Sequence, residues 1–498
     1  MPASTPAASP AEPVRPTEPA RRGDDPSPCV AVVGLGFSGA ATAMQLMRQL
    51  PRGARLLLIE PDARRARGLA YGTRCASHWL NVPAGRLGWD ADNEAGFIDW
   101  LCAQYGAYSA SDFVPRMLLG NYLTQALAAA EQVATARGVQ VQTVTDRVSA
   151  LERTARGGSL LRLAGGGVCR ADVVVLATGH LAPESPRIAG APAWGSPGLI
   201  DQPWDDAALA ALPEDGEVLL LGSGLSAIDM LTWLQDRGHA GRVTMLSRRG
   251  LLPQPHRSLE ARPRPGLVPS QALADARGLV GMLRAVRGWA ALAQAEGHDW
   301  RDVMANLRAC TPRLWQRLSA RERRQFLRHL QPWWDTHRHR LAPGIHTRLQ
   351  AALRAGQVEL HAGRLQAITP CPDGRLDLAW RPRGAAAGVL ERRHVAAIVN
   401  CTGPSARVGH AAQTPPGSLL AALQARGRLA VDAMGLGLRV DDRHRLLDAQ
   451  GRPQAGLHYV GPMLKAQFWE AVAIPELRVH ARSVAEQVVR ALPVTAAA

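Results

Sequence analysis

Two glycine-rich loops in this chain have the residue types and spacing that can bind the phosphates of a dinucleotide. In such a loop the first glycine permits a tight turn, the second lets the backbone approach a pyrophosphate, and the third lets the next helix pack close to the strand. The N-terminus of that helix offers unpaired N–H groups and the positive end of its dipole. The six loop positions are Gly34, Gly36, Gly39, Gly222, Gly224 and Ala227.

In each of the two dinucleotide-binding units, the residue after the second strand predicts whether the bound ribose carries a 2′-hydroxyl or a 2′-phosphate. Glu60 lies 21 residues beyond Gly39, where a carboxylate can accept hydrogen bonds from a ribose 2′-hydroxyl. The second loop is followed instead by Arg248 and Arg249, whose guanidinium groups can bind a 2′-phosphate that a carboxylate would repel. We therefore expect NADPH at the second loop. The alternative is that the two arginines form a solvated corner of an arginine-rich chain.

The segments around the first loop follow the order of the FAD-binding domain in flavoproteins that hold two dinucleotides. A buried strand, Val30–Val33, leads into the loop, and a later strand within Ala171–His180 ends in an A-T-G sequence. Between them we expect a helix over 40–50, a strand over 55–59, helices over 94–105 and 116–137, and a β-meander of strands 139–144, 148–153, 160–163 and 168–170. The candidate FAD contacts in these segments are Phe37, Ser38, Val148, Thr178 and Gly179.

A second strand–loop–helix cycle begins at Glu217, and the segment 250–356 interrupts it with largely helical spacing. His394–Gly403 mirrors the earlier A-T-G strand, and Gly456–Pro462 returns to the first domain with Gly461 as a further candidate flavin contact. We predict an α/β fold of two Rossmann-like dinucleotide-binding domains with a helical insertion. The predicted limits are a disordered tail over 1–28, an FAD domain over 29–205, an NADPH domain over 206–404 with an insertion over 251–356, and a return segment over 405–498.

Composition and cysteine spacing disfavour several classes of protein. The net charge of +16 comes almost entirely from arginine, since Lys465 is the only lysine, and no basic cluster is interleaved with aromatic residues as in a nucleic-acid groove. The seven cysteines form no C-x-x-C pair, which argues against a disulfide reductase and fits a reducing, cytoplasmic compartment. The first 28 residues lack the apolar core of a signal peptide, and no uncharged apolar stretch is long enough to predict a membrane span.

Gln331–Pro343, with the sequence QPWWDTHRHRLAP, is the most unusual stretch of the insertion. One interpretation is a lid over the flavin–nicotinamide junction, whose arginines grip an anionic part of the substrate; substituting them would then alter kinetics and change the melting temperature little. The other is a structural helix end whose tryptophans pack on the core. His337 and His339 point to different helix faces, so no metal centre is predicted. The candidate catalytic residues are Trp334, His337, Arg338 and Arg340.

The sequence from about 30 to 492 resembles the bacterial FAD/NAD(P)-binding proteins of the YdhS-like type. The stretches that carry the resemblance are VGLGFSGA (33–40), GLAYGT (68–73), HWLNVPAGRLG (78–88), FVPRMLLGNYL (113–123), LGSGLSAID (221–229), LWQRLSARERRQFLRHLQPWWDTHRHRLAP (314–343) and EAVAIPELRVHA (470–481). More distantly the chain is similar to flavin N-hydroxylating monooxygenases. The resemblance implies that Asn81 contacts the flavin, whereas His78 is favoured as a core histidine.

Two dinucleotide sites imply that a hydride passes from NADPH to FAD. The leading hypothesis is a monooxygenase that hydroxylates a small amine or amino acid through a flavin hydroperoxide. The alternatives are an FAD-dependent reductase or dehydrogenase with an acceptor other than oxygen, and a flavin-binding redox sensor with little turnover. One departure weighs against a strict monooxygenase assignment: the linker AWGSPGLIDQPWD holds Trp194 and Gly195, but lacks the histidine of the phenylalanine–glycine–histidine signature of class B flavin monooxygenases. The expected partner is a small molecule that is anionic or bears an amine, and neither nucleic acid nor membrane is expected.

Overall fold

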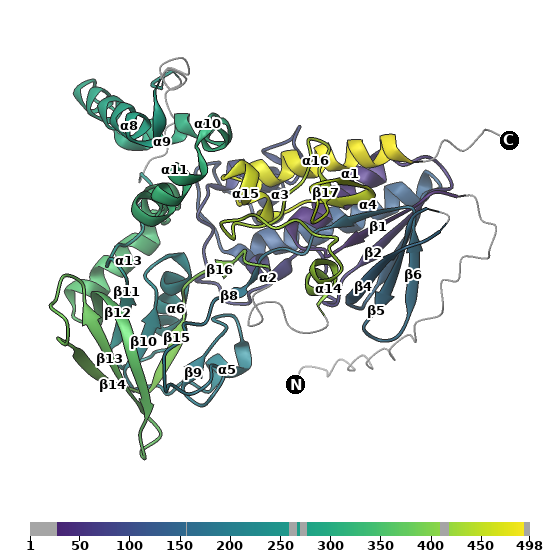
Figure 1. Ribbon diagram of the computed structural model, residues 1–498. Helices are drawn as coiled ribbons and strands as arrows, with labels where there is room; N and C mark the ends of the chain where they lie inside the picture. The colour runs from purple at the N-terminus through teal and green to yellow at the C-terminus, as the bar shows by residue number, and fades with distance from the viewer. Residues whose placement is uncertain (1–26, 156, 258–265, 269–275, 409–417, 493–498) are drawn as a thin grey trace, which may run out of the picture.

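Two α/β domains lie side by side, and a group of helices extends beyond them (Figure 1). The computed structural model describes residues 27–155, 157–257, 266–268, 276–408 and 418–492. The disordered tail predicted over 1–28 falls almost entirely outside the described residues. Within them, no helix is long and apolar enough to cross a membrane.

The first domain is built on a six-stranded sheet in the order β17-β18-β7-β1-β2-β3. All pairs are parallel except β17 with β18, and β1 lies between β2 and β7 with its five residues fully buried. Central parallel strands are covered on both faces, which explains their unbroken apolar runs. The strands of this sheet are β1 (Cys29–Val33), β2 (Arg55–Ile59), β3 (Gln140–Val144), β7 (Val173–Leu176), β17 (Arg445–Leu447) and β18 (Pro453–Tyr459).

Helices cover one face of this sheet, and a small antiparallel sheet lies at the other. On the first face α1 (Phe37–Gln49) packs between α4 (Arg116–Ala136) and α16 (Ile474–Ala491), where the alanines of α1 allow close approach. On the second face lie α14 (Leu419–Ala425) and the antiparallel strands β4 (Val148–Arg153), β5 (Ser159–Leu163) and β6 (Val168–Ala171). The first-domain connections hold α2 (Gly68–Tyr71), α3 (Gly96–Tyr105) and α15 (Lys465–Phe468).

The meander is therefore smaller than predicted. The strand expected over 139–144 is present as β3, but it pairs in parallel with β2 and extends the main sheet. Its alternating polar and apolar residues fit an edge strand as well as they fit a meander, so the pattern alone could not place it.

The second domain is built on a seven-stranded sheet in the order β14-β13-β12-β11-β10-β15-β9. Its parallel centre repeats the plan of the first domain, with β10 between β11 and β15, and α6 (Leu225–Asp236) follows β10. α5 (Asp206–Ala210) precedes β10. The strands are β9 (Leu199–Ile200), β10 (Val218–Leu221), β11 (Val243–Ser247), β12 (Val358–Pro370), β13 (Leu376–Pro382), β14 (Glu391–Val395) and β15 (Ala397–Asn400).

The insertion between β11 and β12 is helical, as predicted, and its last helix belongs to the second domain. α13 (Pro343–Arg354) packs with the buried residues around α6 and is the crossover helix between two parallel strands. The helices before it form a separate group: α8 (Gly278–Ala295), α9 (Trp300–Leu307), α10 (Thr311–Arg317), α11 (Ala320–Gln325), the π-helical turn Phe326–Leu330 and α12 (Gln331–Arg338).

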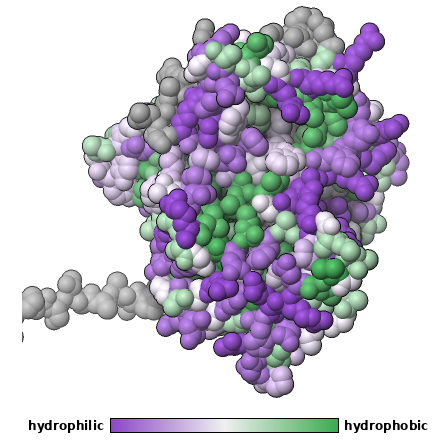
Figure 2. Space-filling model, turned by 90° about the vertical axis from the view of Figure 1, so that its left-hand side faces the viewer, coloured by the Kyte–Doolittle hydropathy of each residue, from purple (hydrophilic) through white to green (hydrophobic). Residues whose placement is uncertain are grey.

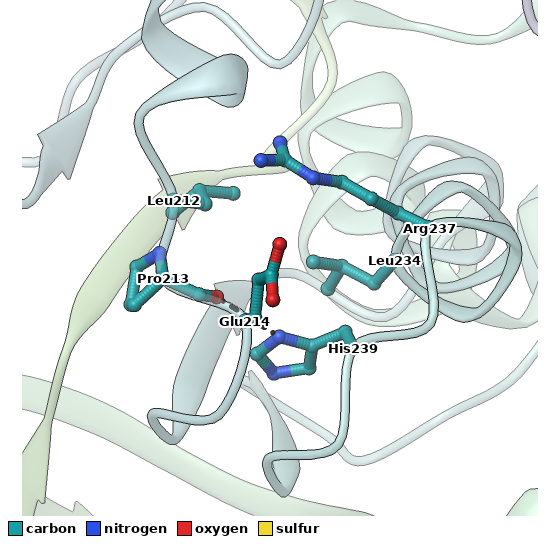
Figure 3. A pocket seen from close by; sticks show the side chains of 6 residues that line it. All are labelled: Leu212, Pro213, Glu214, Leu234, Arg237 and His239. Carbon is teal, nitrogen blue, oxygen red and sulfur yellow. Dashed lines mark hydrogen bonds between the residues drawn. The ribbon is translucent and has the colours of Figure 1, made fainter.

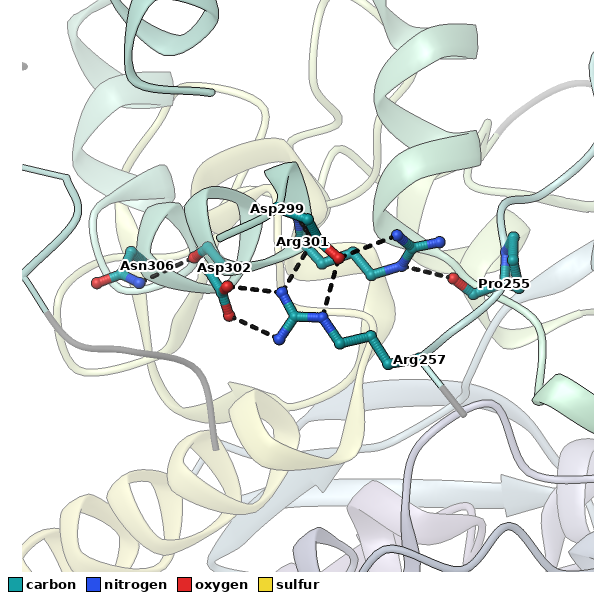
Figure 4. A network of polar contacts seen from close by, with 6 residues as sticks. All are labelled: Pro255, Arg257, Asp299, Arg301, Asp302 and Asn306. Carbon is teal, nitrogen blue, oxygen red and sulfur yellow. Dashed lines mark hydrogen bonds and ion pairs between the residues drawn. The ribbon is translucent and has the colours of Figure 1, made fainter. Parts of the chain in front are cut away.

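A network of arginine and aspartate ties α9 to the segment that leaves β11 (Figure 4). The guanidinium of Arg257 forms bonds of 2.6 and 3.0 Å to the two carboxylate oxygens of Asp302 and one of 2.9 Å to Asp299. Arg301 donates to the carbonyl of Pro255 at 2.9 Å. The backbone then brings both ends of the inserted group together, since His256 N donates to Leu341 O and Leu341 N to Gln254 O.

Although the insertion interrupts the chain of the second domain, it packs on the first. Trp315 of α10 packs against Trp469 with ring centroids 4.5 Å apart and ring planes tilted by 33°, and its indole N–H donates to the carbonyl of Ala466 at 3.0 Å. Arg308 pairs with Glu476 at the start of α16. The insertion therefore bridges the two domains at the return segment of the first.

Candidate functional site

The first glycine loop has the close contacts that require glycine and the open space that a phosphate needs. Gly34 has φ +93°, and a Cβ there would lie 2.5 Å from Ala177 O. A Cβ on Gly39 would lie 1.9 Å from Gly34 O, so the first turn of α1 can approach the loop this closely only if residue 39 is glycine. At Gly36 the nearest atom to an added Cβ is the Cα of Gly68, 3.6 Å away. The space over Gly36 is thus free for a pyrophosphate.

Glu60 lies beside this loop, which is the position expected of a carboxylate that binds the ribose of a dinucleotide. One oxygen of its carboxylate accepts the backbone N–H of Leu35 at 2.6 Å, and the other accepts that of Asp62 at 3.2 Å. These bonds fix the carboxylate next to Gly36 at the carboxyl end of β2.

Gly461 closes the same region from the return segment. It has φ +137°, and a Cβ there would meet Tyr459 Oη at 3.0 Å and Ser38 Oγ at 3.8 Å. The Cα of Thr178 is 3.5 Å from a Cβ built on Gly34. Three segments that are distant in the sequence therefore meet here, and they hold four predicted contacts: Gly34, Ser38, Thr178 and Gly461.

Two other candidates of the first domain are buried. Phe37 is 7% exposed in the core under α1, and Val148 is 3% exposed in the cluster beneath the meander. Their side chains contribute to packing, so each has only its backbone to offer a cofactor.

The second loop repeats the geometry of the first. Gly222 has φ +132°, and a Cβ there would lie 2.2 Å from the carbonyl oxygen of Cys401. Cys401 corresponds to Ala177 of the first domain, because each of these residues stands directly before a T-G sequence. An added Cβ on Gly224 would meet nothing within 4 Å, so this position is more open than Gly36. Ala227, at the third position, is fully buried in the core of its domain.

The two arginines after β11 differ in their surroundings. Ser223, inside the second loop, lies 2.8 Å from the hydroxyl of Ser247, and this contact holds the end of β11 beside the loop. Arg248 is exposed, whereas Arg249 donates a 2.9 Å hydrogen bond to the carbonyl of Arg328 in the insertion. Arg248 is therefore the better placed of the two to bind a 2′-phosphate.

The loop that holds His78 and Asn81 lies at the contact between the domains. His78 is 3% exposed, as expected for a core histidine, and burial followed by the charge of Arg116 lowers its pKa to about 4. The carbonyl of Asn81 lies 3.0 Å from Nε2 of His256, at the start of the insertion. Nearby, Arg116 of the first domain pairs with the buried Asp229 of α6 at 2.8 Å.

The structure gives the candidate catalytic residues of the insertion mainly packing contacts. Trp334 packs in the aromatic cluster with Phe326, and the ring of His337 lies 4.8 Å from that of Trp300. Arg338 forms a bidentate ion pair with Glu470: Nε donates to Oε1 at 3.1 Å, and Nη2 lies 2.8 Å from Oε2 in a poorly aligned contact. Glu470 is 2% exposed, so this pair is buried in the interface between the insertion and the first domain. Arg340 also has a polar partner.

A group of charged residues that the sequence analysis did not select lies next to Gly461. Lys465, the only lysine, stands over the ring of Trp469 at 4.3 Å. Burial raises the pKa of Asp335 on α12, and the charge of Lys465 opposes this shift. Burial lowers the pKa of His180 to about 4, and the charge of Lys465 adds to this shift. Burial, followed by the charge of Arg338 and then that of Lys465, lowers the pKa of His339 to about 3. Lys465 therefore belongs to one charged region with groups of the A-T-G strand end and of α12 with the residue after it.

This region lies at the carboxyl ends of the parallel strands, where open α/β sheets bind ligands. The hollow in Figure 3 lies at the other end of the second domain, beyond the C-terminus of α6, and has no room for a water molecule. It is lined by Leu212, Pro213, Glu214, Leu234, Arg237 and His239.

Comparisons with known proteins agree with this architecture. A family model described as FAD-NAD(P)-binding matches residues 31–181. No curated protein matches the chain. Among solved structures, ornithine hydroxylase from Pseudomonas aeruginosa in its reduced form is similar with a TM-score of 0.60 and 14% identity, over 93% of this chain and 99% of that one.

Two further structures cover the same shares of both chains. They are an ornithine N-hydroxylase from Kutzneria sp. 744 with reduced FAD, NADP⁺ and L-ornithine, at TM-score 0.61 and 15% identity, and L-lysine 6-monooxygenase from Pseudomonas syringae, at TM-score 0.60 and 16% identity. Likeness at these identities establishes the fold. The prediction of an α/β protein with Rossmann-type dinucleotide-binding domains is confirmed, and residues 31–181 match the FAD-NAD(P)-binding model.

Proposed function

We propose that this chain is an FAD-dependent, NADPH-consuming oxidoreductase of the YdhS-like type that hydroxylates the nitrogen of a small amine or amino acid. The observation that carries the proposal is the repeated loop geometry: Gly36 and Gly224 are both open above a tight glycine turn, at the carboxyl edges of two adjoining sheets. The fold shared with ornithine and lysine hydroxylases supports N-hydroxylation among the reactions open to such a protein. The scattered free thiols support a reducing, cytoplasmic location.

The residues divide between the two cofactors. FAD would be held by the Gly34–Gly39 loop, Glu60 and Gly461, and NADPH by the Gly222–Ala227 loop and Arg248. Bound FAD would supply the redox chemistry, which is the transfer of a hydride from NADPH and of electrons to oxygen. The protein contributes orientation, and the aromatic cluster of the insertion limits the access of water to this region.

The charged group beside Gly461 suits a substrate with both an amine and an acid. The carboxylate of Asp335 can accept hydrogen bonds from an ammonium, and the ammonium of Lys465 can bind a carboxylate. Arg338 is a weaker candidate for gripping an anion, because Glu470 already binds its guanidinium. In this proposal α12 presents Asp335 to the substrate and is anchored by the Arg338–Glu470 pair.

The test follows NADPH oxidation, oxygen consumption and hydroxylated product together, with diamines and basic amino acids as candidate substrates. We expect substrate-dependent oxygen consumption coupled to product, and Lys465→Met should raise KM for amino acids more than for diamines. Lys465→Arg, which keeps the charge, is the matched control.

The two alternative functions give different results in the same assay. Anaerobic NADPH oxidation that requires another acceptor, with no hydroxylated product, would favour a reductase. Tight FAD with negligible turnover under every condition would favour a redox sensor.

A further inference from the structure

A turn and two strands at the edge of the second sheet bring three different metal-binding side chains together. Cys371 opens the tight turn between β12 and β13, Asp377 is the second residue of β13, and His394 stands on β14. Asp377 and His394 are directly opposite each other in the antiparallel pairing, so the sheet itself fixes their distance. β13 and β14 lie on the side of the second domain that faces away from the first domain (Figure 1).

The three ligand atoms have separations that suit one tetrahedral ion. Nδ1 of His394 lies 2.8 Å from Oδ1 of Asp377 and 3.8 Å from Sγ of Cys371, and all three atoms lie within 4.8 Å of one another. Zinc bonds of about 2.0 Å to nitrogen and oxygen and about 2.3 Å to sulfur place tetrahedral ligands about 3.3–3.6 Å apart. To enclose an ion, the histidine–aspartate distance would lengthen by about 0.5 Å and the histidine–cysteine distance would shorten by about 0.3 Å.

A fourth side chain orients the imidazole. Oδ2 of Asp373 lies 2.9 Å from Nε2 of His394, and Asp373 also accepts the backbone N–H of Arg375 at 3.0 Å, which fixes the carboxylate in the turn. A carboxylate that binds the far nitrogen leaves Nδ1 facing the cysteine and Asp377, the arrangement found behind metal-binding histidines. Arg375 pairs with this outer carboxylate at 3.9 Å.

From this geometry we infer that Cys371, Asp377 and His394 form a site for one Zn²⁺ ion, with Asp373 as the outer partner of the histidine. A thiolate and a carboxylate balance the charge of the ion, and both His394 and Asp377 are exposed, so water can supply the fourth ligand. The thiol and the imidazole release their protons to solvent when the ion binds. The thiolate selects zinc against magnesium. The bound ion would fasten the 371–375 turn to β14.

The experiment measures zinc affinity of the full-length, FAD-loaded protein by competition with a chromophoric chelator. We expect one Zn²⁺ per chain and no competition by Mg²⁺. Cys371→Ser and His394→Gln should each weaken binding by about 100-fold or more, and Asp373→Asn by about 10- to 100-fold with the stoichiometry retained. Cys102→Ser, which changes an exposed cysteine of the first domain, is the matched control and should leave affinity unchanged.

A second measurement locates the ion on the turn. Zinc should protect Cys371 from alkylation, as read by mass spectrometry of its peptide, while Cys102 stays reactive. The inference is overturned if the protein does not compete with the chelator, or if Cys371→Ser and His394→Gln bind zinc as tightly as the parent. It is equally overturned if Cys371 alkylates at the same rate with and without zinc.

Discussion

The buried pair of Arg338 and Glu470 allows the two interpretations of the insertion to be separated by one substitution. Arg338→Ala removes the cation and leaves a carboxylate that is 2% exposed. Breaking a buried pair in this way costs about 3–5 kcal/mol. The charge of Arg308 also acts on Glu470, so we expect a loss at the lower end of this range, about 3 kcal/mol.

The loss is local, so a global melting temperature is a poor measure in a chain of several packed units. Hydrogen exchange of the amides in α12 and α15 should instead rise in Arg338→Ala after correction for intrinsic rates. Arg338→Ala/Glu470→Gln should recover most of the protection, because the amide at position 470 needs no cation. Arg324→Ala, an exposed arginine of the same insertion, is the control and should change little.

One outcome would refute this reasoning and restore the lid interpretation. In that outcome Arg338→Ala leaves the amide hydrogen exchange of α12 and α15 unchanged. The same variant raises the substrate KM or uncouples NADPH oxidation from product formation. In that case the guanidinium would bind substrate at the expense of its pair with Glu470.

Three further predictions follow from the site geometry. Gly36→Val should fold but purify with a flavin-to-protein ratio below about one tenth, since the added methyl groups occupy the phosphate space; a fully yellow, folded variant would contradict the FAD assignment. Arg248→Ser should reduce the preference for NADPH over NADH in stopped-flow reduction by about tenfold, and Arg249→Ser by less because of its bond to the insertion. Burial lowers the pKa of His78 and of His458 to about 4, below the unfolded value of about 6.5, so their contribution to stability is present above pH 6.5 and is lost as pH falls towards 4. Hydrogen exchange of the amides in β18 should therefore rise between pH 6.5 and 4.5 after correction for intrinsic rates, and less so in His458→Gln; an equal rise in that variant would contradict the role given to His458.

The sequence predicted the parts of the fold that depend on local spacing. The glycine loops, their flanking strands and Glu60 could be identified because each contact lies within one strand–loop–helix unit. The pairing of β3 with β2 could not be predicted, since it depends on which edge of a sheet is open. Gly461 was selected from its position on the return segment, and the structure brings it within reach of Ser38.

The charged groups were harder to predict because their partners come from distant segments. Arg338 and Glu470 are separated by 132 residues, so an arginine-rich stretch looked free to bind an anion. Lys465 carried a signal that was not used, since a single lysine in an arginine-rich chain is unusual. The cysteine–aspartate–histidine group was missed because only the β13–β14 register brings His394 to the turn.

The insertion changes what kind of motion the two domains can make. Two short connections join them, and these pair with each other as β8 (Leu181–Pro183) and β16 (Pro404–Ser405). A joint of this kind alone would act as a hinge about which one domain swings. The packing of Trp315 on Trp469 and the Arg116–Asp229 ion pair add attachments away from that axis, which oppose such a swing. We therefore expect turnover to need no rotation of one domain against the other.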